Sequence, residues 1–221
     1  MKDLSILFEN KDCLVINKPA GLAVQGGEGI KTSLDSLLAE NYDPRPLLVH
    51  RLDRDTSGVI LVAKNKEAAA RFSSYFAERS QGSQIRKLYL GICSKTPQPS
   101  SGVIRLPLEI KGKTKESETR YRLVSENPGI PCSLLELELG SGRMHQIRRH
   151  LAQINCPILG DDKYGDFGLN KTLHKSIGLK RLLLHASRLI IPEEGIDITA
   201  PLPEYFAPFS LTLAGVFSHD T

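Results

Sequence analysis

Apolar and polar residues follow one another in short runs along most of this chain, a pattern that is typical of β-strands. The runs are bounded by turn-forming residues such as Asn, Asp, Gly and Pro. They predict strands over Leu4–Glu9, Cys13–Asn17, Val59–Ala63, Leu88–Ile92, Val103–Leu106, Leu134–Gly140 and Leu182–Ile191. Because strands dominate, the main layer of the fold is expected to be a β-sheet.

Apolar residues at helical spacing predict helices over Ser33–Asn41, Glu67–Ser80 and Arg143–Ile154. The last of these has one apolar stripe, made of Met144, Ile147, Leu151 and Ile154. Most connections between the predicted strands are too short for the helical crossovers that parallel strands require. The predicted fold is therefore α+β, with a mainly antiparallel mixed sheet and flanking helices.

The most linker-like stretch is Lys95–Gly102, which lies between two predicted strands. Because it is short, we interpret it as a loop within one domain. A chain of 221 residues buries a sizeable core, so the expectation is a single domain over residues 1–221 that is stable as a monomer.

Composition excludes several classes of protein. An apolar content of 40% and a charged content of 24% are typical of a globular protein and not of a disordered or fibrous one. No apolar run is long enough to span a membrane, and the first residues do not resemble a signal peptide. Scattered cysteines without metal-site spacing predict free thiols in a reducing cytoplasm, at Cys13, Cys93, Cys132 and Cys156.

The net charge of +4 is distributed unevenly. Residues 51–188 hold 24 of the 29 Lys and Arg residues, but only 13 of the 25 Asp and Glu residues. A basic middle segment of this kind is typical of a protein that binds a polyanion such as nucleic acid. A solvated basic surface without a partner has the same composition, so charge favours nucleic acid without establishing it.

Two short motifs lack parts that their chemistry needs. The stretch "GGEGIKTS" has Ile30 where a phosphate-binding loop requires Gly before Lys. The stretch "DTSG", Asp55–Gly58, is similar to the Asp-Thr-Gly of aspartic proteases, which need two such carboxylates facing each other. The simpler interpretation is a turn in which Thr56 and Ser57 bond the backbone and Gly58 lets the chain bend.

No metal site is expected. His145 and His150 are five residues apart, whereas paired metal ligands on a helix are four apart. Cysteine or carboxylate clusters that would complete a site are not found in the sequence.

The stretch "LVHRLDRDTSGVILVAK", Leu48–Lys64, places several charges directly before a buried strand, where a charge is costly unless it is paired or used. On the helix "GRMHQIRRHLA", Arg148 lies at the margin of the apolar stripe and Arg149 points nearly the opposite way. A partly buried Arg148 needs an anion, and pairing with Asp53 would keep that carboxylate ionised at neutral pH. A purely structural ion pair is the alternative.

A third element is "RKLYLG", in which Tyr89 follows two basic residues in a predicted strand. A tyrosine ring stacks on a nucleobase while its neighbours hold phosphate. A core tyrosine with a satisfied hydroxyl group is the alternative interpretation.

These blocks together resemble the RluA family of pseudouridine synthases. The blocks "HRLDRDTSGVILVAK", "KLYL", "GRMHQIRRHLA" and "RLLLHA" occur in the family's order, and "INKPAGLAVQGG" and "PILGDDKYGD" are similar to two further blocks. The resemblance runs from about Leu4 to about Pro203. It implies a long mixed sheet with an active-site cleft across its middle, and an enzyme that isomerises uridine in RNA to pseudouridine.

The resemblance also implies the roles of individual residues. Asp53 is the nucleophilic carboxylate, Tyr89 stacks on the target base and assists proton removal, and Arg148 pairs with Asp53. The arginines that the resemblance and the charge pattern place near RNA are Arg51, Arg54, Arg143 and Arg149. The reaction needs neither a metal nor a nucleotide cofactor, because no redox step occurs and no water is activated. Whether Asp53 attacks the ribose or acts through a glycal is left open.

Many relatives carry an N-terminal RNA-binding module of the S4 type, and none is expected here, because the catalytic blocks begin close to residue 1. The segment from Gly142 to Asn170 is similar to short members that act on transfer RNA, whereas the Asp53 block is equally similar to members that act on ribosomal RNA. Both targets stay open. Two other hypotheses are an RNA-binding protein without turnover and an aspartyl protease that uses Asp55.

Overall fold

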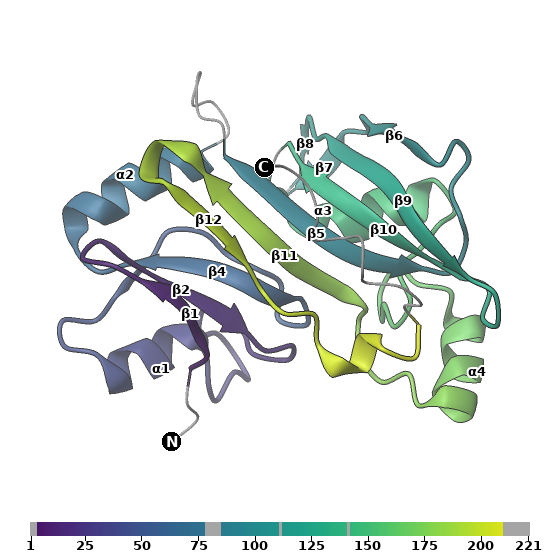
Figure 1. Ribbon diagram of the computed structural model, residues 1–221, viewed down its shortest axis with the longest axis horizontal. Coiled ribbons are helices and arrows are strands. Elements are labelled where there is room, and N and C mark those ends of the chain that lie inside the picture. Colours follow the sequence, from purple (N-terminus) through teal and green to yellow (C-terminus); the bar gives the residue numbers. More distant parts are fainter. Residues whose placement is uncertain (1–3, 78–84, 111, 141, 210–221) are drawn as a thin grey trace. The chain divides into compact units, whose positions relative to one another are not determined.

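The computed structural model describes residues 4–77, 85–110, 112–140 and 142–209. These residues form two compact units, one within Met1–Lys87 and His185–Pro201 and the other within Leu88–Leu184 and Leu202–Thr221. Each unit has strands and helices of its own (Figure 1). The single-domain organisation stays a prediction.

The sheet of the first unit has the strand order β1-β2-β4-β11. Strand β3 pairs with β4, and β12 pairs with β11. All of these pairs are antiparallel except β4–β11, which is parallel and makes the sheet mixed. The strands are β1 Ile6–Glu9, β2 Cys13–Lys18, β3 Leu47–Leu48, β4 Ser57–Ala63, β11 Leu184–Ile191 and β12 Ile196–Thr199.

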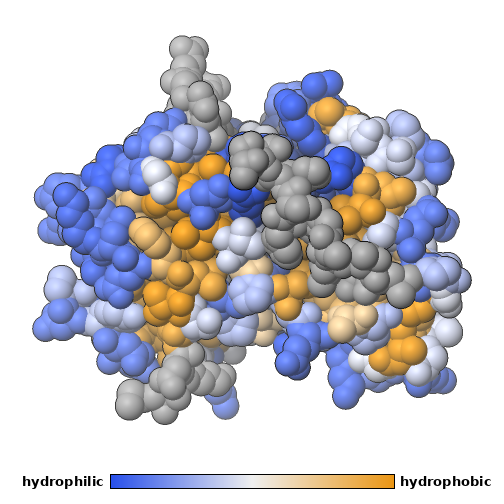
Figure 2. Space-filling model, viewed as in Figure 1, coloured by the Kyte–Doolittle hydropathy of each residue, from blue (hydrophilic) through white to orange (hydrophobic). Residues whose placement is uncertain are grey.

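Strand β4 is buried along its whole length, as expected for a central strand with a continuous apolar sequence. Helix α2, Lys66–Phe76, packs Phe72 into the same hydrophobic core as Val15 of β2 and Leu61 of β4. Helix α1, Leu34–Asn41, is capped by Ser33, whose side chain accepts a hydrogen bond from the amide of Ser36 in a capping box. In Figure 2, hydrophobic residues gather over the strands of this unit, and hydrophilic residues lie at its outer margin.

The second unit contains an antiparallel sheet of order β5-β10-β9-β6 and a separate β7–β8 pair. A 3₁₀ turn, Pro192–Glu194, belongs to the first unit, and another, Glu204–Phe206, belongs to the second. The elements of the second unit are β5 Arg86–Cys93, β6 Ser101–Ile104, β7 Leu108–Ile110, β8 Lys113–Lys115, β9 Thr119–Asn127, β10 Cys132–Leu139, α3 Gln146–Gln153 and α4 Phe167–Ile177.

The predicted fold class is confirmed: the sheet is mixed and mainly antiparallel, with flanking helices. All four cysteines are free thiols, as predicted. The active-site cleft that the resemblance implies would involve both units, and it stays a prediction.

Several predicted bounds were wrong. The helix predicted over Glu67–Ser80 ends at Phe76, because Ala77 is extended, and positions 78–80 lie outside the described residues. The helix predicted from Arg143 begins at Gln146, because His145 has a left-handed backbone with φ 54°. Met144 therefore precedes the helix and is 50% exposed, so it does not belong to the buried stripe.

The sequence pattern missed several elements, namely β3, β7, β8, β9, β12 and α4. Strand β9, "TRYRLVSEN", carries charged residues and is half-exposed along most of its length. Helix α4 buries only Leu173, so it has no apolar stripe that a periodicity argument would detect.

Candidate active site

Asp53 lies in the loop between β3 and β4 and is half-buried. Its carbonyl oxygen accepts a hydrogen bond from the amide of Thr56 at 3.2 Å, which closes a four-residue turn over Asp53–Thr56. The predicted turn over Asp55–Gly58 is thus displaced by two residues, since Ser57 and Gly58 already belong to β4. The turn brings Asp53 to the start of a rigid, buried strand.

Lys18 anchors the loop that carries Asp53, and its side chain is completely buried. The ammonium group donates hydrogen bonds to the carbonyl oxygens of Pro19, Leu22 and Arg54, at 3.0, 2.9 and 3.0 Å. Burial lowers the pKa of Lys18 to about 8, against the opposing effect of the Asp55 and Asp53 carboxylates. An ammonium group has three donors, and all three are used here to join two segments of backbone.

The start of β4 is fixed against β11. Gly58 has φ +108°, and a Cβ atom built on it would lie 2.1 Å from the carbonyl oxygen of Ala186. The sequence predicted that Gly58 lets the chain bend within a turn; Gly58 has the positive φ that favours glycine, but it belongs to strand β4. Ser57, which was expected to bond the backbone, pairs its hydroxyl group with Nδ1 of the buried His185 at 2.9 Å.

Arg148 of helix α3, in the second unit, is 5% exposed, so its predicted burial is confirmed. Its Nε and Nη2 atoms donate to the two carboxylate oxygens of Asp161, each at 2.7 Å. Nη2 also donates to Asp162 at 2.8 Å. The predicted pairing of Arg148 with Asp53, which belongs to the other unit, stays a prediction.

Asp161 is itself held firmly. Its Oδ1 atom accepts hydrogen bonds from the amides of Lys163 and Tyr164, both at 2.9 Å. Burial by itself would raise the pKa of Asp161, but the hydrogen bonds from Arg148 and from these amides together lower it. The carboxylate therefore stays ionised at neutral pH and orients the guanidinium group, which lies 5.3 Å from the centre of the Tyr164 ring.

Helix α3 is anchored by two buried polar side chains four residues apart. Gln146 donates to the carbonyl oxygen of Glu118 at 2.8 Å and to the Thr119 hydroxyl group at 3.1 Å. His150 pairs its Nδ1 with the same Thr119 hydroxyl group and its Nε2 with Ser117 Oγ, both at 2.9 Å. Burial lowers the pKa of His150, so it serves as a neutral structural residue. These bonds fix the register of Arg148 against β9.

The other predicted residues are described within their own units. Tyr89 is on β5 opposite Leu137 and is 8% exposed. Arg51 is exposed, and Arg54 is exposed beside Asp55, with Nε and Oδ1 3.4 Å apart. Two further arginines are half-exposed and donate to backbone carbonyl groups: Arg143, before helix α3, to Glu116, and Arg149, on α3, to Glu109.

Sequence reasoning did not single out Lys18 or Asp161. Lys18 stands in "INKPAG", where the apolar residues before it indicated only a strand. Asp161 stands in "PILGDDKYGD", where two adjacent acids follow an apolar run, much as the acids of the Asp53 loop precede one. A search for charges beside buried runs would have found it.

In the described part of the chain, no helix is long and apolar enough to cross a membrane. The same residues contain no group of three or more His, Cys, Asp or Glu side chains arranged to hold a metal ion.

Comparison with known proteins defines the class of enzyme. A family model described as RNA pseudouridylate synthase matches residues 12–153, a span that contains Asp53, Tyr89 and Arg148. The chain therefore belongs to the pseudouridine synthases, which isomerise uridine in RNA to pseudouridine, and the resemblance noted in the sequence is confirmed. This membership replaces the aspartyl protease hypothesis.

Individual relatives agree with this assignment. The ribosomal large subunit pseudouridine synthase C of Vibrio vulnificus is 35% identical over 92% of this chain and 67% of its own length. An RNA pseudouridine synthase of Zymomonas mobilis is 35% identical, covering 91% of this chain and 94% of its own. Among solved structures, the human RNA pseudouridylate synthase domain containing 4 has a TM-score of 0.75 and 29% identity, covering 92% of this chain and 90% of its own.

Proposed function

We infer that this enzyme converts uridine to pseudouridine in large-subunit ribosomal RNA and that Asp53 supplies the nucleophilic carboxylate. The observation that carries the proposal is the loop at the start of β4, in which Asp53 is half-buried on a backbone tied down by Lys18 and by its own turn. The choice of RNA is supported by the name of the Vibrio vulnificus relative, which spans nearly the whole of this chain.

In the proposed reaction, the bond between C1′ of the ribose and N1 of the uracil breaks. The base rotates, a bond forms between C1′ and C5, the proton on C5 is lost, and N1 gains a proton. Asp53 either attacks C1′ or removes a ribose proton to form a glycal, and both routes use the ionised carboxylate. The target base must leave its stack to be reached, which requires contacts that hold it outside the helix.

Two further residues are proposed to act on the reacting nucleotide. The ring of Tyr89 stacks on the target base and assists removal of the C5 proton. Arg148 pairs with Asp53 and keeps it ionised, in addition to its bonds with Asp161. Arg51, Arg54, Arg143 and Arg149 are proposed to contact RNA phosphates, because each lies at least half-exposed on a basic segment.

Two properties of the whole protein are proposed as well. We propose a cytoplasmic location, because free thiols fit a reducing compartment. A monomeric state is supported by the buried apolar residues within each unit, and light scattering after gel filtration tests it.

Tritium release from uridine labelled at C5 tests the function. Unmodified large-subunit ribosomal RNA and unmodified bulk transfer RNA are each presented to the wild type and to Asp53→Asn. Asp55→Asn is the matched control, since it removes the same charge two residues away. Release from ribosomal RNA that is lost in Asp53→Asn and kept in Asp55→Asn is the expected result.

Other outcomes have definite meanings. Release from transfer RNA alone moves the target to that class of RNA. Release that persists in Asp53→Asn overturns the assignment of the nucleophile. Binding of RNA without any release favours the alternative of an RNA-binding protein without turnover.

A further inference from the structure

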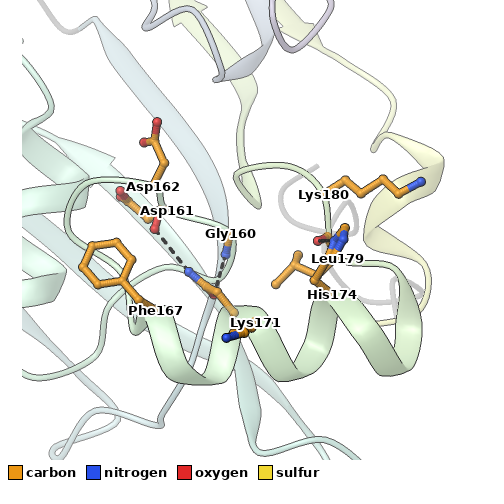
Figure 3. Close-up of a pocket in the computed structure, with 9 residues that line it drawn as sticks. Gly160, Asp161, Asp162, Phe167, Lys171, His174, Leu179 and Lys180 are labelled. Carbon is orange, nitrogen blue, oxygen red and sulfur yellow. Dashed lines mark hydrogen bonds between the residues drawn. The ribbon is translucent and has the colours of Figure 1, made fainter.

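Helix α4 and the loop before it enclose an open pocket of 470 Å³ within the second unit (Figure 3). The pocket is lined by residues of the loop at 160–162, by one face of α4, and by Leu179 and Lys180 beyond the end of the helix. The roles assigned above to Asp53, Tyr89 and Arg148 do not use it. Its shape is held by Asn170, which accepts from the amide of Gly160 and donates to the carbonyl oxygen of Asp161.

One wall of the pocket carries an exposed aromatic ring. Phe167 is the first residue of α4, and 60% of its surface is accessible to solvent. In Figure 3 its ring and the side chain of Lys180 lie on opposite sides of the view, and the helix runs below both. A phenylalanine that contributes little to a core is available to stack on a planar ligand.

The surroundings of the pocket are cationic. Residues 163–181 contain five Lys and Arg residues but a single acid, Asp166. The carboxylate of Asp166 caps α4 by accepting from the amide of Leu169 at 2.9 Å.

Within the described residues, neither Lys171 nor Lys180 forms an ion pair, so both ammonium groups can meet an anion. The two acids that line the pocket, Asp161 and Asp162, are both paired with Arg148. The positive charge of the two lysines is therefore not neutralised by the walls around them.

We propose that this pocket binds one nucleotide of the RNA substrate other than the uridine that reacts, with Phe167 stacked on its base and Lys171 and Lys180 on its phosphates. The inference rests on the proposed function for the identity of the RNA. An aromatic ring beside flexible cations is the combination that proteins use to hold an unstacked nucleotide without reading its sequence. Because Asp161 both lines the pocket and orients Arg148, the pocket lies beside the residue that is proposed to pair with Asp53.

The test compares variants that remove charge inside and outside the pocket. Lys171→Gln combined with Lys180→Gln removes two cations that line it, and Lys175→Gln removes one from the same helix at a position that does not line it. Affinity for unmodified large-subunit ribosomal RNA is measured over a range of salt concentrations, in an Asp53→Asn background so that no turnover occurs. The double lysine variant is expected to flatten the negative slope of log K against log salt. The magnitude of the slope should fall by about 1.4, at about 0.7 for each phosphate of a single strand.

The aromatic contact is tested separately. Phe167→Ala is expected to weaken binding at least about fivefold, the loss of one stacked base. Phe167→Tyr, which keeps a stacking ring, is expected to retain the affinity. With Asp53 restored, the double lysine variant and Phe167→Ala should each raise KM for the RNA, while kcat at saturating RNA is unchanged.

Three results would overturn the inference. The first is a salt slope that flattens as much in Lys175→Gln as in the double lysine variant. The second is an affinity for RNA that is the same in Phe167→Ala as in the parent. The third is a loss of activity in the pocket variants that affects kcat and leaves KM unchanged. Failure of the proposed function gives a different result, because tritium release would then be absent from the unaltered enzyme while the pocket variants still change RNA binding.

Discussion

The guanidinium group of Arg148 and the carboxylate of Asp161 face each other through two hydrogen bonds of 2.7 Å, with 5% and 0% of their side chains exposed. Two parallel bonds fix the plane of the guanidinium group as well as its position. The proposed partner of Asp53 is thus oriented by a second aspartate of its own unit. Breaking such a buried pair leaves a charge without compensation, and that is costly.

Asp161→Asn is expected to lower the free energy of unfolding by about 3–5 kcal/mol, because it leaves Arg148 buried with a neutral partner. Asp162→Asn is the matched control: its side chain is 74% exposed, so we expect at most about 1 kcal/mol. Urea titration followed by circular dichroism measures both. Equal losses in the two variants would contradict the importance of the buried pair.

Lys18→Met is expected to destabilise the enzyme and to lower kcat. Methionine fills a similar volume, but it leaves the carbonyl oxygens of Pro19, Leu22 and Arg54 without their donor, at about 1–3 kcal/mol for each buried group. The loop that carries Asp53 then loses its support. Lys31→Met, an exposed change, serves as the control in both the unfolding and the tritium-release measurements. Full activity in Lys18→Met would show that this support is not needed for turnover.

Gly58→Ala is expected to be poorly tolerated, since the new Cβ would lie 2.1 Å from the Ala186 carbonyl oxygen and the strands would have to separate. Gly178→Ala is the comparison, because Gly178 also has a positive φ, +72°, but has open space around it. For Gly178 we expect about 1–2 kcal/mol of backbone strain alone. Melting temperatures measured by calorimetry should rank Gly58→Ala well below Gly178→Ala. A similar melting temperature for both would mean that β4 and β11 adjust.

Stability should fall in mild acid because His185 is buried in a neutral form. Burial lowers its pKa to about 4, against the opposing effect of its bond to the carbonyl oxygen of Ala200. In the unfolded chain His185 binds a proton near pH 6.5, whereas in the folded chain it does not. Its contribution to the free energy of unfolding is therefore fully present above pH 6.5 and is lost as pH falls toward 4. Between pH 8 and pH 5 the loss from this residue is about 2 kcal/mol. His185→Gln should reduce the pH dependence of the urea midpoint, and an unchanged dependence would assign the loss to other groups.

Arg149→Ala should weaken RNA binding and flatten its salt dependence, because Arg149 lies half-exposed beside the buried Arg148. Removing one phosphate contact lowers the slope of log K against log salt by about 0.7 on a single strand. Thermal stability should change little, since Arg149 donates to the carbonyl oxygen of Glu109 at an exposed site. An unchanged slope would mean that Arg149 does not touch phosphate.

The sequence by itself determined those features that depend on local periodicity. Val59–Ala63 was predicted as a strand from its continuous apolar run. Arg148 was predicted to be a partly buried cation, because side-chain direction along a helix follows from residue spacing. The family was also visible in short blocks of sequence, and the roles proposed for Asp53, Tyr89 and Arg148 follow from those blocks. The places where local reasoning failed lie at the ends of elements, as at Met144, and in elements such as α4 that bury almost nothing.

Only the tertiary structure decided which groups meet. The partner of Arg148 within its own unit, Asp161, comes from a loop whose path is set by turns and by Asn170, and no spacing rule encodes that path. The burial of Lys18 depends on carbonyl groups that two separate loops bring to one point. Such contacts are long-range. Burying these charges and carbonyl groups is costly unless they pair, and their partners reach hydrogen-bonding distance only once the chain has folded.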